Sequence, residues 1–377
     1  METPLHSDYL ELEPFIHQVG GHSFMLSLDA ATVCKPLVQR EFQFYQTVPD
    51  GVQKFIPRFY GIVSVKILQT DDGYVKFIAV PPTDYVPVPN GKKNKVSRTG
   101  SIEMTNANEE ELFREDQDDG KTEDSTPAVL NPWVLKCHRD NICTLLDSFQ
   151  AQNHEGKQFL LLENLTWKFT YPCILDLKMG TRQYGDAATL AKKQSKMYKV
   201  VSTTSAKLGL RVGGMQVYQI TNKHYLCRNK FYGRKLTVNG FQQALVQFLH
   251  NGVRFRSDVL PILIRRLEEL SDVLEHQETI RLYTTSLLLL YEGDDPEPET
   301  LATSSLKRLD SLSFSTKSDS SSCGSPEPNV DVKMIDFAHS THKALDDPVV
   351  YSGPDLGFLF GLEKLIAMLK SIESDYG

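Results

Sequence analysis

The segment PCILDLKMGTRQYGD, residues 172–186, places an acid and a base two positions apart at the end of an apolar run. Side chains at i and i+2 of a β-strand point to the same face, so Asp176 and Lys178 are expected to share one face. A carboxylate near a metal ion and an acceptor, with an ammonium two residues away to hold a phosphate, suits phosphoryl transfer. Gly180 follows and allows the chain to turn. We therefore take Asp176 and Lys178 as candidate catalytic residues, and Lys178 also as a candidate phosphate-binding residue.

A second candidate, Lys35, lies in the apolar strand ATVCKPLV. An unpaired ammonium in that setting would be costly, and Glu41 in the following helical segment is available as a partner. In nucleotide-dependent kinases, a strand lysine paired with a helix glutamate contacts the α- and β-phosphates of ATP. The alternative is a lysine that extends its ammonium to solvent at a strand edge.

A third candidate, Asp336, follows the apolar run VKMI and precedes Phe337. The pair resembles the D-F-G element of protein kinases, whose aspartate binds Mg²⁺, although Ala338 replaces the glycine and His339 comes next. The two-residue match is short, but Asp336 follows a predicted strand late in the chain, and this position supports the resemblance to D-F-G. The HRD at 138–140 lacks the asparagine that a kinase catalytic loop requires, and we interpret it as coincidence.

Basic residues are concentrated in one part of an acidic chain. The net charge is −7, yet residues 177–235 contain thirteen Lys and Arg and one acid, Asp186. The helix expected at about 186–202 has lysines at helical spacing on or near one face: Lys192, Lys193, Lys196 and Lys199. Like charges on one face repel each other, so a bound polyanion would stabilise them, whereas a solvated basic face is the alternative. No nucleic-acid motif accompanies this block, which argues against a nucleic-acid partner.

Patterning along the chain predicts the elements that must position these residues. Strand patterns dominate the first half, and helical spacing is more frequent in the second, for example in SDVLPILIRRLEELSDVLEHQ. We expect an α+β fold with a strand-rich N-lobe at 1–165 and a mixed α/β C-lobe at 166–377. IRLYTTSLLLLYEG and DVKMIDFAHS predict two strands of the C-lobe.

Two polar segments interrupt this pattern, an acidic one at about 90–127 and a serine-rich one at about 294–329, and both are expected to be disordered. The N-terminal segment has no signal-peptide pattern, and no apolar run approaches the roughly 20 residues of a membrane span. Six cysteines without a C-x-x-C pair indicate reduced thiols. We therefore expect a cytoplasmic and/or nuclear protein.

Taken together, these segments resemble the inositol polyphosphate kinase family, and within it the inositol hexakisphosphate kinases. The signature P-x-x-x-D-x-K-x-G is complete at Pro172, Asp176, Lys178 and Gly180. LLENLT, GMQVYQ, RKLTVNGF, TSLLLLYEG and IDFAHS extend the resemblance over nearly the whole chain outside the two polar segments. One departure is visible, since Thr285 stands where the family has the first serine of S-S-L-L.

The resemblance implies a two-lobed, kinase-like fold with ATP between the lobes and Mg²⁺ as the cofactor. It assigns ATP contacts to Lys35, Asp176 and Asp336 and to a hinge at Glu163, Asn164 and Leu165, and catalysis to Asp176, Lys178 and Asp336. Asp336 would also bind the metal ion. Acceptor contacts are assigned to six residues: Lys178, Lys192, Lys193, Lys196, Lys199 and His339.

The implied reaction transfers the γ-phosphoryl group of ATP to a phosphate of inositol hexakisphosphate, which gives diphosphoinositol pentakisphosphate and ADP. Two alternatives stay open. The chain could be a multikinase that phosphorylates ring hydroxyls of lower inositol phosphates, or a catalytically inactive scaffold that binds inositol phosphates.

Overall fold

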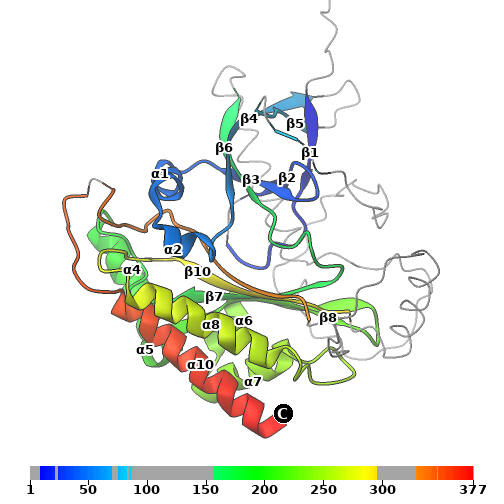
Figure 1. Cartoon of the computed structure of the whole chain (residues 1–377), viewed down its shortest axis with the longest axis vertical. Coiled ribbons are helices and arrows are strands. Elements are labelled where there is room, and N and C mark those ends of the chain that lie inside the picture. The colour runs from blue at the N-terminus through cyan, green and yellow to red at the C-terminus, as the bar shows by residue number, and fades with distance from the viewer. Residues whose placement is uncertain are drawn as a thin grey trace, which may run out of the picture.

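The computed structural model describes residues 9–21, 24–69, 75–82, 85–86, 88, 156–294, 328–345 and 347–376. As expected, the fold is α+β: its strands form a closed antiparallel barrel and a separate five-stranded antiparallel sheet (Figure 1). The barrel contains, in order around it, β1 (Leu10–Pro14), β2 (Leu26–Ser27), β3 (Thr32–Pro36), β6 (Lys157–Glu163), β4 (Phe59–Gln69) and β5 (Val75–Val80). The sheet contains, from edge to edge, β11 (Val330–Ile335), β10 (Ser286–Glu292), β7 (Pro172–Met179), β8 (Leu210–Gln219) and β9 (His224–Arg228).

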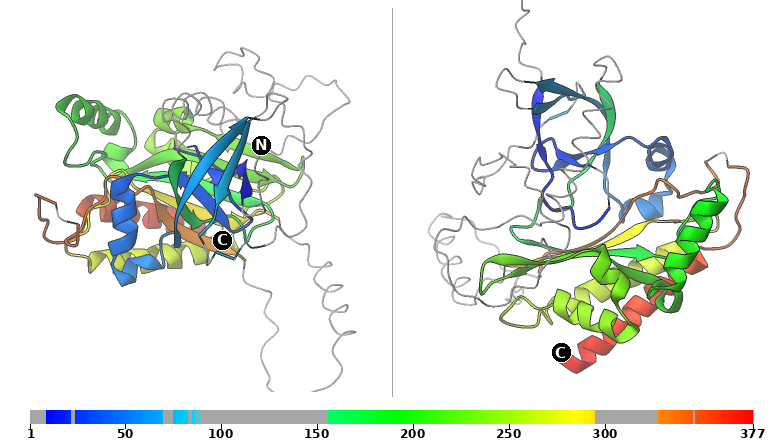
Figure 2. Two further views of the ribbon diagram at one scale, coloured as in Figure 1. Left: turned by 90° about the horizontal axis from the view of Figure 1, so that it is seen from above. Right: turned by 180° about the vertical axis from the view of Figure 1, so that it is seen from behind.

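Helices cover one face of the sheet, and the barrel stands over the other (Figures 1 and 2). The described helices are α1 (Gln39–Thr47), α2 (Asp50–Gln53), α4 (Leu190–Val201), α5 (Ser205–Leu208), α6 (Lys230–Lys235), α7 (Val238–Phe248), α8 (Leu260–Glu275) and α10 (Leu356–Tyr376). The apolar face of α8 is buried at helical spacing, with Leu263, Leu267, Leu270 and Leu274 in the core. No described helix is long and apolar enough to cross a membrane.

Alternation along β7 sets the position of the candidate residues. Leu175 and Leu177 are buried in the core beneath the helices. Asp176 and Lys178 occupy the alternate positions and share one face, as the sequence predicted, and this is the face on the barrel side of the sheet. The apolar face of the strand therefore packs in the core, and its polar face carries the buried Asp176 and the half-buried Lys178.

Two predicted elements have different bounds in the structure. The strand expected from Ile280 begins only at Ser286, because Thr284 has a positive φ of 67° that breaks extended geometry. The helix expected at about 186–202 begins at Leu190, where the Thr189 hydroxyl accepts the backbone N–H of Lys192 as an N-cap. The acidic segment, the HRD and nearly all of the serine-rich segment lie outside the described residues, so their predicted disorder stays a prediction.

Candidate active site

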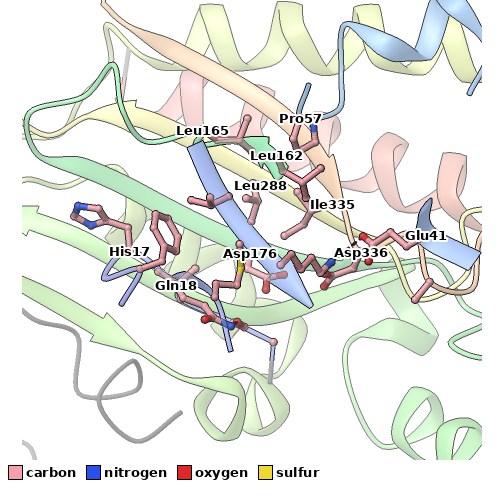
Figure 3. A pocket seen from close by; sticks show the side chains of 18 of the residues that line it. His17, Gln18, Glu41, Pro57, Leu162, Leu165, Asp176, Leu288, Ile335 and Asp336 are labelled. Carbon is pink, nitrogen blue, oxygen red and sulfur yellow. Dashed lines mark hydrogen bonds and ion pairs between the residues drawn. The ribbon is translucent and has the colours of Figure 1, made fainter. Parts of the chain in front are cut away.

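A cavity of about 330 Å³ is lined by residues of the barrel, the sheet, α1 and α4 (Figure 3). Nine of the candidate residues line it: Lys35, Glu163, Asn164, Leu165, Asp176, Lys192, Lys196, Asp336 and His339. Lys178 reaches the same place through its ion pairs, whereas Lys193 and Lys199 are not among the lining residues. Segments that are distant in the sequence are thus brought to one site.

Lys35 lies at the centre of the charged groups. Its Nζ is 2.8 Å from Glu41 Oε1 and 2.8 Å from Asp336 Oδ1. Glu41 Oε1 also accepts the backbone N–H of Phe337 at 3.2 Å, which links α1 to the segment after β11. Lys35 is only 8% exposed, so the structure contains the predicted pair with Glu41 and not a solvent-directed ammonium.

Lys178 bridges two carboxylates. Its Nζ is 3.4 Å from Asp176 Oδ2 and 3.3 Å from Asp336 Oδ2, and it donates a hydrogen bond to the Ser286 hydroxyl. Asp176 Oδ1 is buried and has no hydrogen-bond partner among the described residues. A buried carboxylate oxygen without a partner is costly, so this atom is available for a ligand.

Two effects act on the pKa values of Asp176, Lys178, Lys35 and Asp336: burial disfavours the charged forms, and attraction between opposite charges favours them. Burial raises the pKa of Asp176, partly opposed by Lys178 and reinforced by Asp336. Burial also acts against the charged form of Asp336, but Lys35 and Lys178 outweigh it and hold its pKa well below the ordinary value. For Lys35 and Lys178, burial is likewise outweighed by the neighbouring carboxylates, and both pKa values are raised. Asp336 and the two lysines are therefore charged at neutral pH.

The backbone at Asp336 is unusual, with a φ of 71° directly after β11 ends at Ile335. Aspartate tolerates this left-handed conformation better than most residues, and such geometry often occurs at functional sites. It directs the carboxylate toward Lys35 and Lys178.

A glycine turn that the sequence analysis did not use as a site feature covers Asp176. A Cβ on Gly20 would lie 1.9 Å from Asp176 Oδ2, and a Cβ on Gly213 would lie 2.9 Å from Asp176 Oδ1. A β-bulge between β7 and β8 at this position brings Gly213 close to the carboxylate. The glycine pair in HQVGGHS was the available signal, because only glycine permits this approach of backbone to a side chain.

The cavity that contains the carboxylates of Asp176 and Asp336 also has basic residues in its lining. Lys192 and Lys196 of α4 lie there with His339. Burial and the nearby Lys192 and Lys196 lower the pKa of His339. Burial, together with Lys199 and Arg211, lowers the pKa of Lys196.

Arg211 was missed by the sequence analysis. It is buried, donates to the Ser205 hydroxyl at 3.0 Å, and is paired across the sheet with Lys178. Burial, reinforced by Arg234, lowers its pKa to about 10. Like charges on cross-strand neighbours are destabilising, so this pair also favours a bound anion.

The residues present fit a magnesium ion held together with a phosphate ligand. Asp176 and Asp336 both form ion pairs with the Lys178 ammonium, and Asp176 Oδ1 has no hydrogen-bond partner among the described residues. Mg²⁺ is commonly bound by one or two carboxylates plus substrate phosphates and water, and it does not require an all-protein set of ligands. No group of three or more His, Cys, Asp or Glu that could hold a metal occurs in the described part of the chain.

Comparison with known proteins agrees with this chemistry. The family profile described as inositol polyphosphate kinase matches residues 159–370. Inositol hexakisphosphate kinase 1 of Homo sapiens is 41% identical, with 97% of this chain and 94% of that protein covered. Inositol hexakisphosphate kinase 3 of Mus musculus is 37% identical, with coverage of 96% and 95%.

A solved structure of an inositol phosphate multikinase from S. cerevisiae, in complex with ADP and Mn²⁺, matches 57% of this chain and 84% of its own, at 26% identity and a TM-score of 0.44. The family profile and the near full-length relatives settle the classification. The chain belongs to the inositol polyphosphate kinase family.

Proposed function

We propose that this protein is an inositol hexakisphosphate kinase. It transfers the γ-phosphoryl group of ATP to a phosphate of inositol hexakisphosphate. The observation that carries the proposal is one cavity that joins the Lys35–Asp336–Lys178–Asp176 cluster to the basic wall of Lys192 and Lys196. The near full-length relatives that carry this name support the choice of acceptor.

The barrel and the sheet with its helices act as the N-lobe and the C-lobe, with the boundary near residue 165. ATP lies between them, with its base against the connection from β6 to β7. The Asn164 side chain donates to Ala30 O at 2.7 Å, and its backbone N–H donates to Ala31 O at 2.7 Å. Asn164 thereby fixes the connection, and the backbone of Glu163 and Leu165 provides the hydrogen bonds to the base.

Each charged residue then has a defined task. Lys35, oriented by Glu41, binds phosphates of ATP. Asp336 and Asp176 hold Mg²⁺, which neutralises charge on the phosphates when it is bound. Lys178, Lys192, Lys196 and His339 bind the acceptor, and we add Arg211 to this set. Lys199 strengthens the positive potential around the acceptor without lining the cavity, and Lys193 does not line the cavity either.

The acceptor oxygen belongs to a phosphate and is already ionised near neutral pH, so little general-base catalysis is required. A bond forms between this oxygen and the γ-phosphorus, the bond to the β,γ-bridging oxygen breaks, and its electron pair leaves with ADP. Two polyanions repel each other as they approach. Positioning and charge neutralisation by the lysines therefore dominate catalysis.

The multikinase alternative differs only in the acceptor, and the same cavity is compatible with it. The inactive scaffold is disfavoured by the intact arrangement of Lys35, Asp176, Lys178 and Asp336, because binding alone does not require a carboxylate with an unpaired buried oxygen. We also infer a cytoplasmic and/or nuclear location. The described cysteines Cys34, Cys173 and Cys227 are free thiols, which supports it.

The purified protein should be incubated with Mg-ATP and a panel of inositol phosphates and examined by ³¹P NMR. A diphosphate signal with the hexakisphosphate is the expected result, and Asp336→Asn should abolish it. New monoester signals with lower phosphates alone would establish the multikinase alternative. Phosphate binding without any turnover would establish the scaffold.

A further inference from the structure

The helix α4 has two faces of different character. Lys192 and Lys196 line the cavity. The other side carries four large apolar side chains that are mostly exposed: Leu190 (72%), Met197 (53%), Tyr198 (75%) and Val201 (75%). At 3.6 residues per turn these four fall within an arc of about 100°, roughly opposite Lys192 and Lys196.

This apolar face is not explained by packing within the described structure. Val200 is the one buried residue of α4, and the element that α4 contacts is α5. The helix lies at an edge of the molecule in both views of Figure 2. A contiguous apolar surface of this kind, bordered by polar residues, is typical of an interaction site.

The charges around the face indicate what it binds. Lys193 borders the apolar arc on the side of Met197, whereas Lys199 lies on the opposite face close to Lys192. Lys207 on the adjoining α5 is exposed. No Asp or Glu occurs between residues 187 and 257. A helix with an apolar face, a lysine-rich polar face and an aromatic side chain among its apolar residues matches helices that lie in the surface of anionic membranes.

We propose that α4 is a membrane-docking helix, which lies in the plane of an anionic lipid surface. Leu190, Met197, Tyr198 and Val201 enter the boundary between headgroups and acyl chains. Lys193 and the exposed Lys207 of α5 contact lipid phosphates. The inference goes beyond the proposed function. Because Lys192 and Lys196 are on the other side of the helix, the cavity stays accessible to a soluble polyphosphate while α4 is docked.

The test is co-sedimentation of the full chain with vesicles of phosphatidylcholine alone or with about one quarter phosphatidylserine. The double variant Leu190→Ser with Tyr198→Ser removes apolar area from the docking face. A matched control, Val253→Ser with Leu356→Ser, removes side chains of similar exposure, 62% and 73%, from other surfaces. We expect binding to the anionic vesicles to fall roughly tenfold or more in the α4 variant and to stay near wild type in the control.

Circular dichroism of both variants verifies that they are folded. Equal binding of wild type and α4 variant would overturn the proposal, as would equal binding to neutral and anionic vesicles. Vesicles could instead bind to the lysines of the cavity. In that case saturating inositol hexakisphosphate would abolish binding and the α4 variant would bind as wild type does, and this result would also overturn the proposal. If the wild type does not bind vesicles but forms dimers that the α4 variant does not form, the face is a contact between copies and the lipid proposal fails.

Discussion

At the scale of single residues, the position of Asp176 depends on the absence of a side chain at Gly20. A methyl group there would lie 1.9 Å from Asp176 Oδ2 and 2.9 Å from its Cγ, so either the carboxylate or the glycine turn must move. We expect Gly20→Ala to lower kcat/KM at least roughly tenfold, because a misplaced carboxylate loses the metal and phosphate geometry. It should also lower the free energy of unfolding by about 1–3 kcal/mol through overpacking. Steady-state kinetics and thermal unfolding measure the two effects.

A suitable control is Gly51→Ala in α2. A Cβ at Gly51 would first meet Val273 Cγ1 at 3.6 Å, an ordinary van der Waals contact. This change should leave activity intact and stability equal or slightly higher, since alanine is the better helix former. Wild-type kinetics in Gly20→Ala would contradict the role given to the glycine turn.

The sequence predicted some site residues better than others for physical reasons. Lys35 and Glu41 are six residues apart on adjoining elements, so their pairing follows from local spacing. Arg211 was not predicted as a site residue, because its strand passes through two glycines and a β-bulge that no apolar alternation reveals. The unpaired oxygen of Asp176 depends on packing between distant segments and could not be read from the sequence.

At the scale of elements, α1 is fastened to the segment after β11 by two neighbouring residues. Glu41 accepts the Phe337 N–H. Arg40 Nε donates to Ser340 O at 2.9 Å. The guanidinium also forms a bidentate ion pair with Asp347, in which Nη1 is 2.7 Å from Oδ1. We expect Arg40→Ala to lower kcat several-fold by loosening the helix that orients Lys35, and to cost about 1 kcal/mol of stability. Arg40→Lys should restore only part of the activity, because an ammonium cannot reproduce the planar pair.

Kinetics and chemical denaturation of these variants are compared with Lys76→Ala, which removes an exposed ion pair with Glu11 in the barrel. That control should behave as wild type. If Arg40→Ala retains full kcat, the fastening of α1 is not required for catalysis.

Element types were more predictable than element limits. The periodic apolar spacing of α8 is strong enough to define a helix by itself. By contrast, the β10 limit depends on Thr284, a β-branched residue in a left-handed conformation that propensity disfavours and that only the tertiary environment imposes. The antiparallel order β11-β10-β7-β8-β9 is likewise a product of long-range packing.

At the scale of the whole molecule, the concentration of basic charge around the cavity should make acceptor binding sensitive to salt. We expect KM for inositol hexakisphosphate to rise steeply between about 0.05 and 0.5 M salt, and more steeply than for a kinase with a neutral acceptor, because ions screen exposed charges. Initial rates at constant Mg-ATP measure this dependence. A KM independent of ionic strength would contradict the acceptor site assigned to α4 and its surroundings.

The pH dependence of global stability should reveal His17, which lies beside Phe15 and Tyr225, with Nδ1 3.3 Å from Gln216 Nε2. Burial lowers its pKa from 6.5 to about 4. The unfolded chain therefore binds a proton between these values that the folded chain does not, so stability is full above pH 6.5 and falls as the pH decreases toward 4. The loss attributable to His17 is at most about 3 kcal/mol.

His17→Gln should flatten this acid limb, because glutamine carries no titratable group. Urea denaturation at pH 7, 5.5 and 4 measures the slope, and other acid-sensitive groups cancel in the difference between variant and wild type. His276→Gln, at an exposed position at the end of α8, provides the matched control for replacing a histidine by glutamine. If the stability of wild type and of His17→Gln depends on pH in the same way, protonation of His17 does not destabilise the fold. The surroundings of the imidazole would then be less apolar than the structure indicates.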